Sequence, residues 1–128
     1  RWTDMAFIQT VAYSDSDAAI YVNNLKVALV RSITELVKTE LHELKAIGET
    51  QPVSVTAGGK SFEVVLTREE SNDAINFPML DEFTLRVKRA HSVVTYSKCR
   101  LKSVEIERRA GEPLLEKITL TAEGRKEV

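Results

Sequence analysis

In 83-FTLRVKR-89, 93-VVTYSKCRLKSVEIER-108 and 114-LLEKITLTA-122, apolar residues recur at every second position. This period is typical of β-strands that turn one face to a core and the other to water. Only short turns separate the three segments. The sequence therefore predicts three consecutive strands, and we expect the rest of the chain to be organised around them.

The middle segment changes the face that it buries twice. Its apolar positions are even, then odd, then even again: Val94, Tyr96, Cys99, Leu101, Val104, Ile106. Each change of parity predicts an extra residue or a bend in the strand. A long strand that serves two faces in this way is typical of a barrel or a bent sandwich.

Two further hairpins are predicted by short turn signals. Asn23-Asn24 separates the β-prone runs 20–22 and 25–30, and Gly58-Gly59 separates 53–57 from 61–66. Asn and Gly tolerate the positive φ angles that two-residue hairpin turns need.

The segment 32–48 is open to two interpretations. Ser32 and Glu35 have the spacing of a helix capping box, apolar residues recur at helical intervals, and Gly48 is suited to end a helix. The competing interpretation continues the preceding strand through Ile33 and places another over 39–47. Local periodicity by itself favours the helix.

Residues 68–82 form the only long connection. Pro78 opposes a regular strand, and one helical turn is expected near 72–76. The apolar side chains of this connection make simple disorder implausible, so we expect them to be buried on their own domain or on another subunit.

The chain ends are expected to be an N-terminal arm, 1–17, and a polar tail, 123–128. The arm has aromatic and aliphatic anchors and is expected to dock on a partner. Together, the arm and the long connection supply the predicted subunit interface: Trp2, Phe7, Ile8, Asp73, Ile75, Phe77, Met79, Leu80.

Composition predicts one ordinary domain, since the 128 residues are 43% hydrophobic. The single cysteine, Cys99, excludes an internal disulfide framework and is expected in the core. With no leader sequence and no apolar run near twenty residues, we expect a soluble protein from a reducing compartment. His42 and His91 stand alone, and no nucleophile or phosphate-loop pattern is present. We therefore expect no enzyme, catalytic residue, metal or cofactor.

Charge is unevenly divided along the chain. Residues 83–109 contain eight bases and two acids, whereas residues 60–82 contain six acids and two bases. The bases form a predicted basic assembly surface: Arg86, Lys88, Lys98, Arg100, Lys102. Such a surface is typical of a solvated face or of one that matches the acidic 60–82 segment of a neighbouring copy, and it alternatively suits the phosphates of nucleic acid.

Two parts of the sequence resemble the tail tube proteins of contractile and long-tailed bacteriophages. The run 43-ELKAIGETQPVSV-55, followed by the glycine turn and aromatic strand 58-GGKSF-62, is similar to the first half of that family. The segment 94–104, followed by 116–122, is similar to its closing strands. The resemblance spans 18–124 and concerns strand order and short runs of similar sequence, without a catalytic signature.

The resemblance implies a mainly β (α+β) domain over 1–128, with two antiparallel sheets in a sandwich-like barrel and one short flanking helix. It favours strands over 32–48. It also implies homo-oligomeric rings of six that stack into a tube in the virion tail, assembled in the cytoplasm of the bacterial host.

The implied partners are further copies of the chain and a sheath or other tail proteins, with DNA only as passing cargo and no membrane. We expect Lys98, Arg100 and Lys102 to face outward or toward a neighbour, because in the lumen they would bind the passing DNA. Three alternatives remain open: a tail terminator, a type VI secretion tube protein, and a monomeric β-barrel module that binds nucleic acid through strands 86–102.

Overall fold

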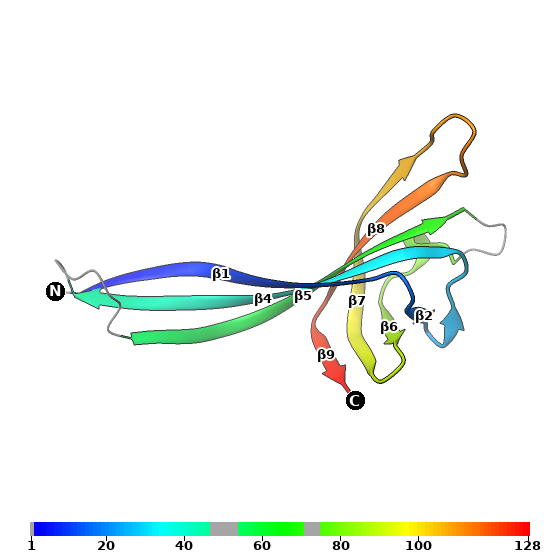
Figure 1. Ribbon diagram of the computed structural model, residues 1–128. Coiled ribbons are helices and arrows are strands. Elements are labelled where there is room, and N and C mark those ends of the chain that lie inside the picture. Colours follow the sequence, from blue (N-terminus) through cyan, green and yellow to red (C-terminus); the bar gives the residue numbers. More distant parts are fainter. Residues whose placement is uncertain (1, 47–53, 71–74) are drawn as a thin grey trace.

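The protein, described by a computed structural model, is built almost entirely of β-strands (Figure 1). The structure describes residues 2–46, 54–70 and 75–128, with side chains from 6–42, 59–70 and 75–128. Within these ranges there is no α-helix. The elements are β1 (Trp2–Asp15), β2 (Ala19–Val22), β3 (Leu25–Lys26), β4 (Val30–Ala46), β5 (Ser54–Glu69), the 3₁₀ turn η1 (Phe77–Met79), β6 (Phe83–Lys88), β7 (Val93–Glu107), β8 (Leu115–Ala122) and β9 (Gly124–Glu127).

All nine strands belong to one antiparallel sheet. Their order is β1-β4-β5-β8-β7-β6-β2-β3, and β9 pairs with β7. The sheet remains open, so the expected pair of sheets closed as a barrel is wrong. The reason lies in β7, whose first half pairs with β6 and β9 and whose second half pairs with β8. This one strand joins the two halves into a single bent sheet.

The two changes of parity predicted in β7 are confirmed as register shifts. Between the pairs Phe83↔Cys99 and Leu85↔Tyr96, β7 has one residue more than β6. Lys98 lies at this bulge with a φ of 51°. The second shift lies between Leu101 and Ser103 in the pairing with β8. The strands predicted in 83–122 are therefore present, with both bends where the parity changes.

The Asn23-Asn24 hairpin is confirmed. The two residues have φ angles of 48° and 68°, as a type I′ turn requires, and they connect β2 to the very short β3. Asn23 also continues the pairing with β6 beyond the end of β2. Its N–H donates to the carbonyl of Thr84, and its Oδ1 accepts from the N–H of Thr84, both at 3.0 Å.

Two local predictions are overruled by strand pairing. Gly58-Gly59 is not a hairpin turn, because both glycines lie within the continuous strand β5, beside a register shift against β4. The helix over 32–48 is also wrong: β4 is a strand of 17 residues, as the family resemblance favoured. Hydrogen-bonding partners on both sides of β4, supplied by β1 and β5, outweigh the local capping pattern.

The flanking helix is absent from the described residues. The helical turn expected over 72–76 falls largely on 71–74, outside the described part of the chain. The remainder of the connection contains only η1, whose first positions include Pro78. The missing N–H of Pro78 is harmless in the first turn but prevents regular strand pairing.

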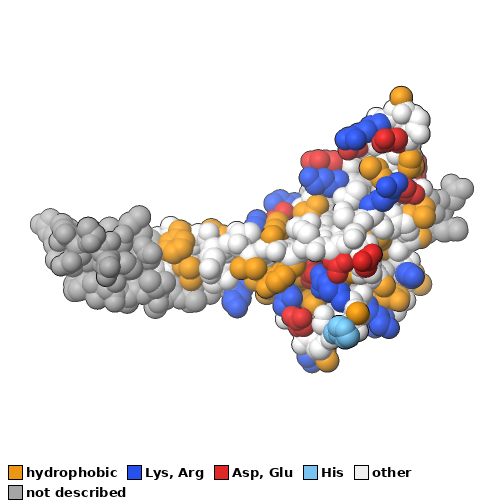
Figure 2. Space-filling view, viewed as in Figure 1, with side chains coloured by type: hydrophobic (Ala, Val, Ile, Leu, Met, Phe, Trp, Pro, Cys, Tyr) orange, Lys and Arg blue, Asp and Glu red, His pale blue; other side chains and the backbone are white. Residues whose placement is uncertain are grey.

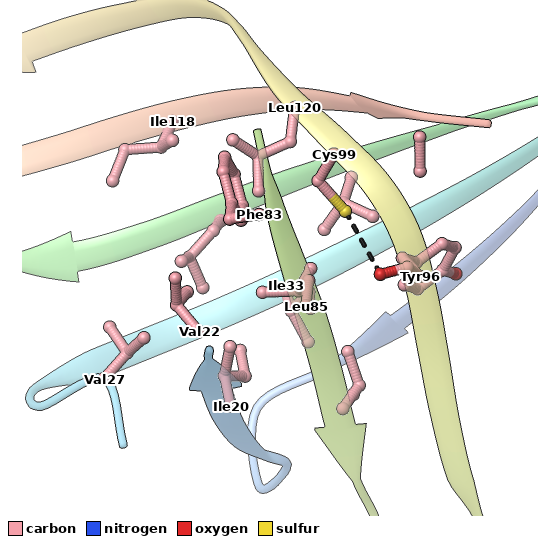
Figure 3. Close-up of a cluster of buried hydrophobic side chains, with 14 of the residues drawn as sticks. Ile20, Val22, Val27, Ile33, Phe83, Leu85, Tyr96, Cys99, Ile118 and Leu120 are labelled. Atoms are coloured by element: carbon pink, nitrogen blue, oxygen red, sulfur yellow. Dashed lines mark hydrogen bonds between the residues drawn. The ribbon is translucent and has the colours of Figure 1, made fainter. Parts of the chain in front are cut away.

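The core lies between the two halves of the bent sheet (Figure 3). Inward side chains of β2, β6 and the first half of β7 pack against those of β4, β5 and β8. Cys99 is buried as expected, and its thiol donates to the carbonyl of Tyr96 at 3.4 Å. Burial raises the pKa of this thiol to about 11.

Strands β1, β4 and β5 extend far beyond this core as a three-stranded arm (Figure 1). β1 and β4 pair without a register shift from Trp2↔Ala46 to Asp15↔Ile33. At about 3.4 Å per residue, the 14 residues of β1 span roughly 48 Å. The predicted N-terminal arm is thus the edge strand of a much larger projection.

Candidate interaction surface

One face of the arm is apolar and continues the core into solvent. Phe7 lies opposite Leu41, and Val11 lies opposite Val37, which in turn lies opposite Phe62. Opposed residues of an antiparallel pair share a face, so these five side chains form one surface, the apolar arm face. Phe7 and Val11 are each 41% exposed. Figure 2 shows hydrophobic side chains along the described part of the arm.

The opposite face of the arm is mixed in character. It presents Ile8 among polar residues, including Ser14 and Thr34, whose hydroxyls lie 3.2 Å apart. Lys38 donates to Glu63 at 2.9 Å on this face. That hydrogen bond holds the pKa of the Glu63 carboxyl below its ordinary value. Only one face of the arm therefore has the apolar composition of a protein core.

The arm also has two free strand edges. β1 pairs with β4 alone among the described residues, and residues 54–61 of β5 pair only with β4. Long exposed edges are normally protected by lysine, proline or bulges, since they pair readily with other strands. β1 contains no Lys, Arg or Pro, and its pairing is unbroken. These edges are suited to pair with another chain.

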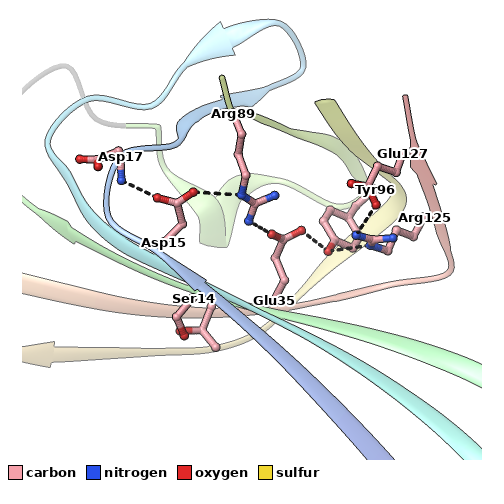
Figure 4. A network of polar contacts seen from close by, with 9 residues as sticks. Ser14, Asp15, Asp17, Glu35, Arg89, Tyr96, Arg125 and Glu127 are labelled. Carbon is pink, nitrogen blue, oxygen red and sulfur yellow. Dashed lines mark hydrogen bonds and ion pairs between the residues drawn. The ribbon is translucent and has the colours of Figure 1, made fainter. Parts of the chain in front are cut away.

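A buried polar cluster closes the core where the arm begins (Figure 4). Its centre is Glu35 on β4, which is fully buried. Arg89 donates to Glu35 Oε2 and, at 3.0 Å, to Asp15 Oδ2, while the Tyr96 hydroxyl donates to Glu35 Oε1. A buried carboxylate is tolerated when donors satisfy it in this way.

Arg125 of β9 extends the cluster to the surface (Figure 4). Its Nε donates to the Tyr96 hydroxyl at 3.3 Å, and its Nη2 lies 3.2 Å from Glu127. Its guanidinium carbon also lies 5.9 Å from the ring centre of Tyr13 on β1. The cluster therefore links β1, β4, β7 and β9 and fixes the base of the arm.

The long connection is held by Arg68, which is almost fully buried. Its guanidinium pairs with Glu116 at 3.0 Å and donates to the carbonyl of Ile75 at 2.5 Å. Its Cζ lies 4.8 Å from the ring centre of Phe77, which packs edge-to-face on Phe83. This connection is therefore docked on its own domain.

The structure separates the predicted interface residues. Phe7 and Ile8 lie exposed on opposite faces of β1, Phe77 is fully buried in the core, and Ile75 and Leu80 pack partly against it. Met79 projects into solvent with 78% exposure. Trp2 lies in β1 but its side chain falls outside the described ones, and Asp73 lies outside the described residues.

Three residues of the predicted basic assembly surface are already paired with glutamates. Lys98 lies 3.8 Å from Glu123, Arg100 lies 3.3 Å from Glu82, and Lys102 lies 3.6 Å from Glu63. All three bases are exposed. The acidic segment thus meets the basic one within a single chain, through Glu63 and Glu82. Arg86 and Lys88 lie apart from these pairs, on β6.

Sequence reasoning missed the residues that define the arm and its base. Val11, Tyr13, Glu35 and Val37 all belong to a run of odd positions on β1 and β4. That shared parity was available in the sequence. It was obscured in β4 by the capping-box spacing of Ser32 and Glu35, which suggested another period.

The described residues hold no group of three or more His, Cys, Asp and Glu arranged for a metal ion. None of the helical structure in the described ranges is long and apolar enough to cross a membrane. What the described chain does present is an exposed apolar arm face bordered by two free strand edges.

No protein-family model matches the chain, and no curated protein matches it. The resemblance in strand order therefore remains a prediction. Any proposed function must be argued from the arm, its edges and its apolar face.

Proposed function

We propose that the protein is a structural subunit of a phage-type tail tube, which joins further copies into stacked rings of six around a DNA-conducting channel. The proposal rests on the arm, whose apolar face continues the core without a second layer of described residues to cover it. It also draws on the resemblance in strand order. Its place would be the virion tail, beside sheath or other tail proteins.

A second copy is the partner that best fits the arm. A sheet face of this kind is stable when another layer covers it, and burying a Phe or Val side chain contributes about 1.5–3 kcal/mol. Phe7 and Val11 leave much of that contribution unused in the single chain. Every copy of the chain carries the same apolar arm face and the same free edges. Self-association can therefore cover the face and pair the edges of every copy at once.

The edges favour a cyclic arrangement. β1 and β5 lie on either side of β4 and are both antiparallel to it, so they run in the same direction along the arm. Copies related by rotation about a common axis keep their arms in the same direction along that axis. The free edge of β1 then meets residues 54–61 of β5 in the next copy as a parallel pair. Such a contact joins unlike surfaces, which is what ring closure requires.

Electron microscopy tests the assembly directly. The purified full chain, imaged by negative stain at high concentration, is expected to show rings or tubes with a central hole. Val11→Lys places a charge on the apolar arm face and should abolish them, while Ile8→Lys, on the opposite face, should leave them intact. A wild-type chain that stays monomeric at every concentration would refute the proposal.

Disulfide trapping tests the strand pairing. Gln9 and Lys60 both lie level with Thr39 on the two free edges, roughly 10 Å apart across β4, too far for a bond within one arm. Gln9→Cys/Lys60→Cys, or Val11→Cys/Lys60→Cys for a shifted register, should form covalent ladders after oxidation. Each single variant should give none. Dimers from Gln9→Cys alone would instead indicate two-fold pairing of β1 with itself.

A tail terminator and a type VI secretion tube protein share the expected ring architecture. Rings that do not stack into tubes would favour the terminator. Tubes formed without any affinity for a phage sheath would favour the secretion system. Both outcomes keep the arm-mediated ring.

A further inference from the structure

We propose a second binding surface, for single-stranded nucleic acid, on the outward face of β3, β2, β6, β7 and β9. It is separate from the arm and does not depend on the proposed tube. It also differs from the surface formed by Lys98, Arg100 and Lys102. We call it the basic platform: Tyr21, Lys26, Thr84, Arg86, Lys88, Thr95, Lys126.

Strand register aligns these residues in a row. Lys26 pairs with Tyr21, Tyr21 with Arg86, Arg86 with Thr95, and Thr95 with Lys126. The neighbouring residues Ile20, Leu85, Val94 and Tyr96 point into the core, so this row points outward. Five adjacent strands place Lys26 and Lys126 roughly 19 Å apart, with Arg86 midway. Lys88 extends the positive charge to the next row of β6.

The chain leaves the charge of the platform uncompensated. No described carboxylate forms an ion pair with Lys26, Arg86, Lys88 or Lys126, whereas Lys98, Arg100 and Lys102 each have one. The outward positions of the row contain no acidic residue. A surface with several unpaired cations attracts a polyanion and releases its counterions on binding.

Arg86 lies over an aromatic ring and has unused hydrogen-bonding capacity. Its guanidinium carbon lies 4.7 Å from the ring centre of Tyr21. Its Nε is the one buried side-chain nitrogen or oxygen of the described residues without a hydrogen-bond partner. This pair borders a hollow of about 330 Å³, lined also by Asn23, Asn24, Thr84 and Thr95. A guanidinium plane supported by an aromatic ring is a stacking surface for a nucleobase.

The chemistry of the platform favours nucleic acid over an acidic protein. Protein interfaces place apolar and aromatic residues at their centre and are depleted in lysine. Here lysines flank the central Arg86 on both sides, and the next row adds the apolar Ala19, Val93 and exposed Val128 beside Lys88. Interfaces with nucleic acid are polar and positively charged. The flat strand surface offers no helix or ribbon for a duplex groove, so an unpaired strand is the better fit.

Fluorescence anisotropy with a labelled oligo-dT of about 15 nucleotides, at about 50 mM salt, tests the proposal. With three to four phosphate contacts, affinity should fall roughly 20- to 50-fold between about 50 and 200 mM salt. Lys26→Glu/Arg86→Glu/Lys126→Glu should abolish binding. The matched control Lys98→Glu/Arg100→Glu/Lys102→Glu, which changes net charge equally, should retain most of it.

Arg86→Lys separates stacking from charge. It keeps the cation but removes the planar group, so affinity for oligo-dT should fall about tenfold with the salt dependence unchanged. Urea unfolding of each variant establishes that the fold is retained, and Lys26→Glu/Lys126→Glu serves if the triple variant unfolds. Three results would overturn the proposal. These are no binding of oligo-dT by the wild type at low salt, equal loss of binding in both triple variants, or binding of a poly-glutamate peptide as strong as that of oligo-dT.

Discussion

The hydroxyl of Tyr96 on β7 donates a hydrogen bond to Oε1 of Glu35 on β4, across the core and at the base of the arm. Both side chains are fully buried. Water cannot replace either partner there, so this contact fixes β4 at the point where the arm leaves the body.

Replacing Tyr96 with Phe should lower the free energy of unfolding by about 1–3 kcal/mol. The change deletes one donor and leaves Glu35 Oε1 buried without its hydrogen bond, while the ring still fills the core. Urea denaturation at pH 7 measures the loss. Tyr21→Phe provides the control, because the outward hydroxyl of Tyr21 makes no hydrogen bond with a described residue, and it should stay within about 0.5 kcal/mol of wild type.

Stability should depend on alkaline pH through the same hydroxyl. Burial, followed by the Glu35 carboxylate, raises the pKa of Tyr96 well above its ordinary value of 10, since both disfavour the phenolate. The stabilisation is therefore fully present below pH 10 and is lost as the pH rises beyond it, by about 1.4 kcal/mol per unit. The stability difference between wild type and Tyr96→Phe should narrow from pH 9 to pH 11. A constant difference over that range would contradict the assigned role.

Phe77 and Met79 should behave in opposite ways, although both lie in η1. Phe77 is fully buried against Phe83 and Arg68, so Phe77→Ala should cost about 3–5 kcal/mol. Met79 is largely exposed, and Met79→Ala should leave the unfolding midpoint unchanged. Thermal unfolding compares the two. If Met79→Ala nevertheless reduces assembly in sedimentation, the predicted interface role of Met79 gains support.

Much of the fold could be predicted because alternation of apolar residues reports burial directly. The strands of 83–122 and both bends of β7 follow from parity alone. Asn23-Asn24 was also readable, because the two positive φ angles of a type I′ turn select such residues locally. In each case the deciding information lies within a few residues.

The failures concern contacts distant in sequence. Gly58-Gly59 has the composition of a turn, yet β5 continues through a register shift at these glycines and pairs with β4 on both sides of them. Glu35 looked like a capping residue, because its partners Arg89 and Tyr96 lie 54 and 61 positions away. No local sequence pattern predicts a buried carboxylate whose hydrogen-bond donors lie far away in the sequence. The arm was predicted only as the single segment 1–17, since its three-stranded form exists only once β1, β4 and β5 pair.

Lys98 offers a test of the bulge in β7. Its φ of 51° is a conformation that costs an L-residue about 1–2 kcal/mol and glycine almost nothing. Its ion pair with Glu123 is exposed and contributes little. Lys98→Gly should therefore raise the free energy of unfolding by about 0.5 kcal/mol, after the greater chain entropy of glycine in the unfolded state is subtracted.

Arg100→Gly is the matched comparison, because Arg100 is also exposed and ion-paired on β7 but has an ordinary strand backbone. There the same change should lower stability by about 0.5–1 kcal/mol, since glycine gains nothing from relieved strain. Urea denaturation of both variants should thus give effects of opposite sign. Equal destabilisation would mean that the bulge at Lys98 relaxes without strain, and that the change of parity in β7 is imposed by its apolar residues alone.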